Sequence, residues 1–114
     1  MKIVLFDRDV RDHIGIRWFL QLYVANDVDV AFCTTLQQLS SKLQTFQPDV
    51  ALINVDLLPM SERDTMYYVI KQSGCHIVAM TDEPLYAQAL KAIALRAHAL
   101  LQKPIDLERL KNLL

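Results

Sequence analysis

Polar side chains follow four of the short apolar runs in this 114-residue chain, and together they could bind ions. Asp7-Arg8-Asp9 follows the first run, Asn54-Val55-Asp56 the third, Thr81 the fourth and Lys103-Pro104 the fifth. Carboxylate oxygens are the ligands that a hard divalent cation needs, whereas a lysine can contact an anion. If the apolar runs are parallel strands, these positions lie at the carboxyl ends of the sheet, where α/β folds bind ligands.

Apolar runs and longer helical patterns alternate regularly along the chain. The expected strands are residues 3–6, 28–33, 50–54, 76–80 and 99–102, and the expected helices are residues 9–26, 35–46, 61–73, 84–97 and 107–114. Thr35 with Gln38 forms a capping box, Ser61 with Asp64 opens the third helix, and Gly74 ends it. Continuous apolar strands between helices predict a parallel sheet covered on both faces, a doubly wound α/β domain over residues 1–114.

Composition excludes several classes of protein. With 53% apolar and 22% charged residues, the chain is not disordered. A formal charge of −1 gives no bulk attraction to nucleic acid or acidic membranes. The two glycines, Gly15 and Gly74, are too few for a glycine-rich phosphate loop. Two cysteines, Cys33 and Cys75, are expected to be free thiols. Because no apolar run suits a signal peptide or a membrane span, we expect a cytoplasmic protein.

Taken together, the strand exits resemble the receiver domain of bacterial two-component response regulators. An acidic turn, an acceptor position, a threonine and a Lys-Pro pair follow strands one, three, four and five in register over essentially the whole chain. The most specific stretches are residues 86–93 and 100–107. The resemblance implies a flavodoxin-like fold, with five parallel strands in the order 2-1-3-4-5 and helices on both faces.

In that family, acidic residues after strand one and a phosphoacceptor aspartate after strand three hold Mg²⁺. The lysine after strand five contacts the phosphoryl group, and the Ser/Thr after strand four follows it on activation. By this resemblance Asp7, Thr81 and Lys103 match. Arg8 stands at the second, metal-ligating acidic position, and Asn54 stands at the phosphoacceptor.

Other positions depart from the family pattern as well. Leu100 occupies the place of the switch aromatic, three residues before the lysine. Leu58 replaces the usual proline and Glu62 the usual glycine in the loop after strand three, and Arg96 stands where a glycine often ends the fourth helix. The framework is kept while the residues that carry the chemistry are replaced.

These replacements change what the site can do. Asp7, Arg8, Asn54 and Lys103 together are net positive, or neutral when Asp56 is counted, which disfavours Mg²⁺. An asparagine amide is not a nucleophile toward phosphoryl donors. We therefore predict a pseudo-receiver that is not an enzyme, needs no cofactor and binds no Mg²⁺ in this pocket.

Three interpretations of the degenerate pocket stay open. Asp7, Arg8, Asp56 and Lys103 could form only an ion-pair network, with Arg8 in the place of the metal and paired with Asp7 or Asp56. The pocket could instead bind an anion or a small-molecule effector. Asp56, two residues past Asn54, could also serve as a displaced phosphoacceptor if the loop shifted.

Other reactive residues give no motif. His13, His76 and His98 lie on separate expected elements without metal-ligand spacing. Ser61 and Ser73 lack a nucleophile elbow, so a hydrolase is not indicated.

The first helix is apolar almost all the way round, whereas a surface helix has one apolar stripe. The apolar residues are Ile14, Ile16, Trp18, Phe19, Leu20, Leu22, Tyr23 and Val24. One interpretation is that the aromatics cover neighbouring loops; the other is a partner surface centred on Trp18, Phe19 and Tyr23.

We predict a non-catalytic signalling module that regulates an output through dimerisation or docking of a regulatory protein. The candidate surfaces are the first helix and the face formed by helix four, strand five and helix five. Because the last helix stops at Leu114 after about two turns, we expect the N-terminal part of a longer transcription regulator. Nucleic acid would then be contacted only through a separate C-terminal output domain.

Overall fold

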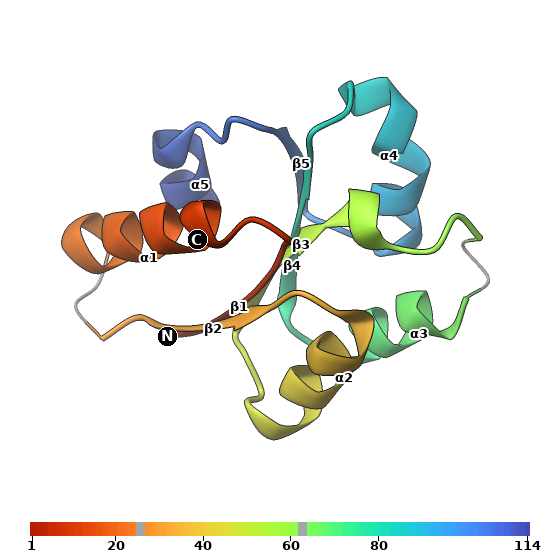
Figure 1. The fold of residues 1–114 in the computed structure, drawn as a ribbon, viewed down its shortest axis with the longest axis horizontal. Helices are drawn as coiled ribbons and strands as arrows, with labels where there is room; N and C mark the ends of the chain where they lie inside the picture. The colour runs from red at the N-terminus through yellow and green to blue at the C-terminus, as the bar shows by residue number, and fades with distance from the viewer. Residues whose placement is uncertain (25–26, 62–63) are drawn as a thin grey trace.

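A computed structural model describes residues 1–24, 27–61 and 64–114. Its five strands are parallel and form one sheet in the order β2-β1-β3-β4-β5 (Figure 1). The strands are β1 (Lys2–Phe6), β2 (Asp29–Cys33), β3 (Val50–Asn54), β4 (His76–Thr81) and β5 (Ala99–Gln102). This confirms the doubly wound, flavodoxin-like sheet expected from the sequence.

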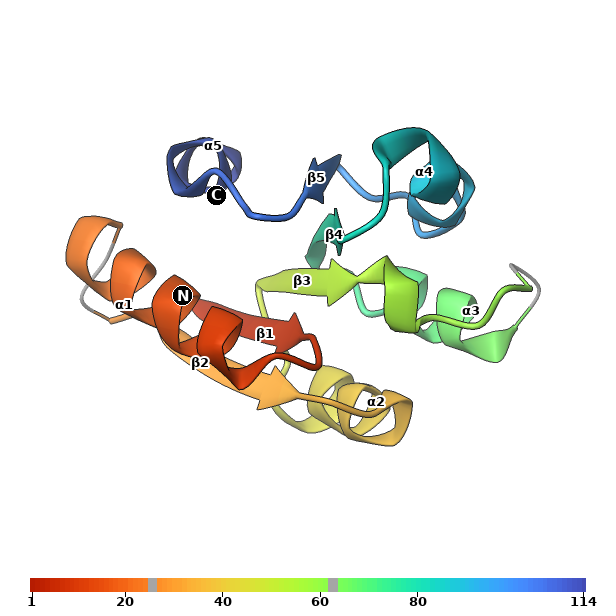
Figure 2. The ribbon, with the colours of Figure 1, turned by 45° about the horizontal axis from the view of Figure 1, so that its top comes forward.

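Helices cover both faces of the sheet. They are α1 (Val10–Tyr23), α2 (Leu36–Thr45), α3 (Thr65–Gln72), α4 (Leu85–Ala94) and α5 (Leu107–Leu113), with a short 3-10 helix, η1 (Val55–Leu57), after β3. The helices α1 and α5 lie on one face, and α2, α3 and α4 lie on the other (Figures 1 and 2). None of the helices in the described part of the chain is long and apolar enough to cross a membrane.

Alternation along the strands divides the core in two. In β1, Ile3 and Leu5 pack with α1 and α5, while Val4 and Phe6 pack with α2, α3 and α4. All five residues of β3, the central strand, are buried, and its side chains pack into the cores on both faces of the sheet. Continuous apolar runs are what a sheet covered on both faces requires.

Local signals set most helix ends. The capping box at Thr35 and Gln38 forms as predicted and satisfies amides at the start of the helix. Asp9 caps α1 by accepting a hydrogen bond from the Arg11 amide. Gly74 follows α3 with a φ of 76°, the left-handed conformation that glycine tolerates best.

Three predicted boundaries need correction or lie outside the described residues. The third helix begins at Thr65 rather than Ser61, because Asp64 is its N-cap and accepts from the Met66 amide, as capping aspartates do. The fourth ends at Ala94, and Arg96 turns the chain with a φ of 56°. The predicted end of the first helix at residues 25–26, and Glu62 in the third loop, lie outside the described residues.

The register of the strands brings together the polar residues that follow β1, β3, β4 and β5. Phe6 is level with Ile53, Asn54 with Met80, and Thr81 with Gln102. The residues that follow these strands therefore meet at one edge of the sheet.

Candidate functional site

Asp7 is the centre of a buried polar cluster at this edge. Its side chain is fully buried, and Oδ1 accepts hydrogen bonds from the Asn54 Nδ2 at 2.9 Å and from the Arg8 backbone amide at 2.7 Å. Its Oδ2 lies 2.5 Å from Lys103 Nζ. Both carboxylate oxygens are thus satisfied, as a buried charge requires.

Lys103 connects this cluster to α1. Its ammonium also lies 2.6 Å from the carboxylate of Asp12, in the first turn of α1, and its backbone amide donates to the Thr81 carbonyl at 2.7 Å. Burial alone would lower the pKa of Lys103, but its hydrogen bonds and attraction to Asp12 and Asp7 outweigh burial and raise that pKa, since an opposite charge favours the charged form. The lysine therefore stays charged and joins β1, α1 and the end of β5.

Asp56 is the centre of a second cluster beside the first. Its Oδ1 accepts from the Thr81 hydroxyl at 2.6 Å and from Gln88 Nε2 at 2.7 Å, and its Oδ2 accepts from the Asp82 amide at 2.8 Å. Partial burial raises the pKa of Asp56, but the hydrogen bonds from Thr81, Asp82 and Gln88 and the charge of Lys91 outweigh it. The net shift is downward, because donors to a carboxylate stabilise its ionised form.

The two clusters meet at Asn54. Its amide nitrogen donates to Asp7, while its Oδ1 accepts from the Asp56 backbone amide at 2.9 Å. The asparagine thus caps η1 and supports the buried carboxylate at the same time.

Lys91 adds a further link between α4 and η1. Its ammonium donates to the Val55 and Leu58 carbonyls at 3.2 and 3.3 Å. Residues three apart on a helix share one side of it. Gln88 and Lys91 therefore both reach back to the segment that follows β3.

The ion-pair network differs from the predicted one at Arg8. Ion pairs among the described residues join Arg11 to Asp9 and Lys103 to both Asp7 and Asp12, and Arg8 takes part in none of them. The Arg8 side chain is exposed, and Arg8 reaches Asp7 through its backbone amide. Lys103, and not Arg8, forms the ion pair with Asp7.

Three contributors were missed from the sequence, namely Asp12, Gln88 and Lys91. Each lies on a helix rather than at a strand exit. The signals available were the position of Asp12 in the first turn of α1 and the three-residue spacing of the other two.

Mg²⁺, which the resemblance implies for an intact receiver, does not fit this donor set. Both Asp7 oxygens are in use, Asn54 presents an amide nitrogen to the cluster, and the Lys103 ammonium lies between Asp7 and Asp12. A divalent cation here would be repelled by that ammonium at short range.

Thr81 and Leu100 occupy the positions that carry switching in the resembled family. Thr81 is buried and donates to Asp56 rather than to a group at position 54. Leu100 is half-buried against the core of the α2, α3 and α4 face.

The histidines are less scattered than their sequence positions indicate. His76 and His98 stack with ring centroids 3.9 Å apart, because β4 and β5 are neighbours. His13 stacks on Phe32 at 4.5 Å, and burial lowers the pKa of its imidazole. In the described part of the chain, no three His, Cys, Asp or Glu side chains gather as metal ligands would.

Both cysteines are free, as expected. Cys33 is buried and Cys75 half-buried, and burial raises the pKa of both thiols.

The predicted surface on α1 divides between exposed and packed residues. Trp18 and Tyr23 are 60% and 62% exposed, whereas Phe19 is half-buried and lies 5.2 Å from the Tyr23 ring. An exposed apolar ridge at four-residue spacing, which places side chains on one side of a helix, is formed by Val10, Ile14, Trp18 and Leu22.

The helix α4 carries a second exposed apolar surface. Tyr86, Leu90 and Ile93 are 85%, 73% and 69% exposed. Their spacing of four and three residues places them on one side of the helix. Exposed apolar side chains therefore lie on α1 and on the α4 part of the second face named from the sequence.

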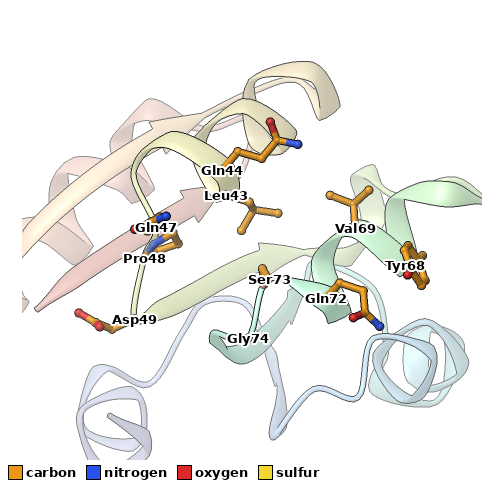
Figure 3. Close-up of a pocket in the computed structure, with 10 residues that line it drawn as sticks. All are labelled: Leu43, Gln44, Gln47, Pro48, Asp49, Tyr68, Val69, Gln72, Ser73 and Gly74. Atoms are coloured by element: carbon orange, nitrogen blue, oxygen red, sulfur yellow. The ribbon is translucent and has the colours of Figure 1, made fainter.

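A cavity of about 700 Å³ lies away from these clusters. It is lined by the end of α2, the loop into β3, and α3 with the turn after it (Figure 3). Gln47, Pro48 and Asp49 precede β3 and Gly74 precedes β4, so this cavity opens at the opposite edge of the sheet from Asp7.

Several solved structures with a similar fold are described as receiver domains. The chain resembles the signal receiver domain of a DNA binding response regulator protein (merR) from Colwellia psychrerythraea 34H, with TM-score 0.80, 16% identity and coverage of 98% of this chain and 93% of that one. The signal receiver domain of an HD domain-containing protein from Pseudomonas fluorescens Pf-5 has a TM-score of 0.80 and 20% identity, and the match covers 98% of this chain and 89% of that one. A CheY-like receiver domain protein from Methanospirillum hungatei JF-1 has a TM-score of 0.76 and 16% identity, and the match covers 97% of this chain and 87% of that one. No family model and no curated protein matches the sequence, so the likeness is one of fold.

Proposed function

We propose that this chain is a pseudo-receiver, a signalling module with the receiver fold that acts without phosphorylation. It has no catalytic role, takes no Mg²⁺ and works in the cytoplasm as the regulatory part of a longer protein. The observation that carries the proposal is the Asp7 cluster, in which Asn54 and Lys103 satisfy both carboxylate oxygens from within the protein.

Chemistry at position 54 supports the same conclusion. In-line attack on a phosphoryl group requires a nucleophilic oxygen with a lone pair to donate, and Asn54 offers a neutral amide. That amide is already used on both sides, by Asp7 and by the Asp56 backbone.

The alternative phosphoacceptor, Asp56, is disfavoured by its contacts. Both of its oxygens accept hydrogen bonds from Thr81, Asp82 and Gln88, and Lys103 contacts Asp7 and Asp12 instead. The cation nearest in effect, Lys91, donates to the Val55 and Leu58 carbonyls, so it is not placed on Asp56 to neutralise an incoming phosphoryl charge.

The domain would regulate its output by binding a second copy of the chain or a regulatory protein through an apolar surface. Exposed aromatic and aliphatic side chains anchor interfaces, and this chain has them on α1 around Trp18 and on α4 around Leu90. The merR neighbour, described as part of a DNA binding response regulator, supports a DNA-binding output domain here.

The test is an amide NMR titration of the labelled protein with Mg²⁺ and then beryllofluoride, observing Asp7, Asn54, Asp56, Thr81 and Lys103. We expect only the small shifts that any salt produces. Saturable shifts at these residues, or a mass increase of one phosphoryl group with acetyl phosphate and Mg²⁺, would overturn the proposal.

A matched gain-of-function variant makes a negative result informative. The double substitution R8D and N54D restores the two acids that the resemblance calls for. This variant should bind Mg²⁺ saturably under conditions in which the natural sequence does not. If neither binds, the fold rather than the two residues prevents binding, and the argument from residue chemistry is wrong.

A further inference from the structure

The inward side of helix α4 carries polar as well as apolar side chains, since Ala92 is buried in the core beside the two residues that contact η1. Gln88 and Lys91 point to η1, while Tyr86, Leu90 and Ile93 face solvent. A surface helix held only by apolar burial turns its polar side chains to solvent. The polar contacts to η1 therefore contribute to where α4 lies.

Those contacts converge on one carboxylate. Asp56 lies in η1, and its donors come from residues 25 positions on, at the end of β4, and 32 positions on, in α4. The Asp82 amide in the loop between β4 and α4 supplies a third donor. One side chain thus links η1, the β4–α4 loop and α4.

We infer that Asp56 is an internal anion latch that fixes α4 in one position, with Thr81 directed inward. This deepens the proposed function, on which it rests, by naming what replaces an added phosphoryl group: a carboxylate that belongs to the chain itself. Without that carboxylate, the Thr81 hydroxyl, the Asp82 amide and the Gln88 amide lose their shared acceptor, and unpaired polar groups favour a more open arrangement.

Hydrogen exchange of the α4 amides tests the latch in the full chain. Asp56→Ala and Gln88→Ala should each accelerate exchange in residues 85–94 at least about tenfold, while α1 changes little. Asp82→Ala is the matched control, because it removes a neighbouring exposed carboxylate and keeps the backbone amide that contacts Asp56. Unchanged exchange of α4 in both Asp56→Ala and Gln88→Ala overturns the inference.

Chemical rescue separates the latch from general damage. Asp56→Ala leaves three donors around a space of carboxylate size, so added sodium formate should bind there and slow α4 exchange again. Sodium chloride at equal ionic strength should not do so, and formate should have no effect on the natural sequence. Failure of formate to slow exchange, together with equal effects of both salts, means that Asp56 acts as a packing residue and not as an anion.

The Gln88→Ala variant should fold even if Asp56→Ala does not, because alanine is the best helix former and position 88 is only half-buried. The exchange measurement uses no phosphoryl donor. If beryllofluoride binds the natural sequence, the proposed function fails while the latch can still be measured. If α4 exchange is insensitive to these variants, the latch fails while the pseudo-receiver proposal stands.

Discussion

The Asp7 and Asp56 clusters lie at the same edge of the sheet, yet they neutralise their carboxylates in different ways. Asp7 is fully buried and pairs with an ammonium, which Asp12 shares. Asp56 is half-buried and accepts from a hydroxyl and two amide groups. The first cluster joins α1 to the end of β5, and the second joins η1 to α4.

The two clusters therefore differ in what they control: the Asp7 cluster affects the stability of the whole domain, and the Asp56 cluster affects the position of α4. Removing one partner from a buried ion pair leaves a charge without compensation, which is costly for the whole domain. Removing a donor from a half-buried carboxylate costs less, because water can replace it. The Asp7 cluster is therefore suited to hold the fold, and the Asp56 cluster to control one helix.

The largest expected effect is that of Lys103→Met, which leaves Asp7 buried without its cation. We expect the free energy of unfolding to fall by about 3 kcal/mol, measured by urea denaturation. Lys111→Met, on the exposed side of α5, should change it by less than about 0.5 kcal/mol. Equal losses in the two variants would show that the Asp7 pair has no special weight.

Thr81→Val should have a smaller effect. It removes the donor to Asp56 and the acceptor of the Glu83 amide. The expected loss in the same assay is about 1 to about 2 kcal/mol. Thr45→Val, at an exposed position on α2, is the control. A loss as large as that of Lys103→Met would erase the distinction between the two clusters.

The pH dependence of stability should distinguish Asp56 from its neighbour Asp82. Because the pKa of Asp56 is lowered in the folded state, its stabilising effect is complete above the ordinary value and is lost as the pH falls through the lowered pKa. The difference in unfolding free energy between the natural sequence and Asp56→Asn should thus shrink below pH 3.8. Asp82→Asn, at a neighbouring exposed position, is the control substitution. A gap for Asp56→Asn that persists in acid would contradict the role of the charge.

The smallest effect on stability is expected at the two exposed apolar surfaces, because the Trp18 and Leu90 side chains are largely in solvent. Trp18→Glu and Leu90→Glu should each change the unfolding free energy by less than about 0.5 kcal/mol. In sedimentation experiments, the variant on the true interface should abolish concentration-dependent association and the other should not. If both variants associate as the natural sequence does, neither α1 nor α4 forms the interface.

Sequence reasoning located the fold and the strand exits because both depend on simple geometry. Buried parallel strands read as continuous apolar runs, and their carboxyl ends must meet at one edge. Caps such as Thr35 with Gln38 are local, so their residues alone predict them.

The partners within the site could not be predicted in the same way. The three-residue spacing places Gln88 and Lys91 on one side of α4, but it does not show that this side meets acceptors in η1, so their roles were not predicted. The Arg8 side chain was misassigned because its direction depends on the turn after β1. The stacking of His76 on His98 depends on the register between β4 and β5, which the expected strand order alone does not give.

The contact between Asp7 and Lys103 spans 96 residues, nearly the whole chain. As the chain leaves the ribosome, β1 can pair with β2 and β3 long before the lysine has been synthesised. We therefore expect Asp7 to be without its cation until late in folding, when the ion pair closes. In folding kinetics this contact should have a low φ-value, so that breaking it accelerates unfolding while the folding rate changes little.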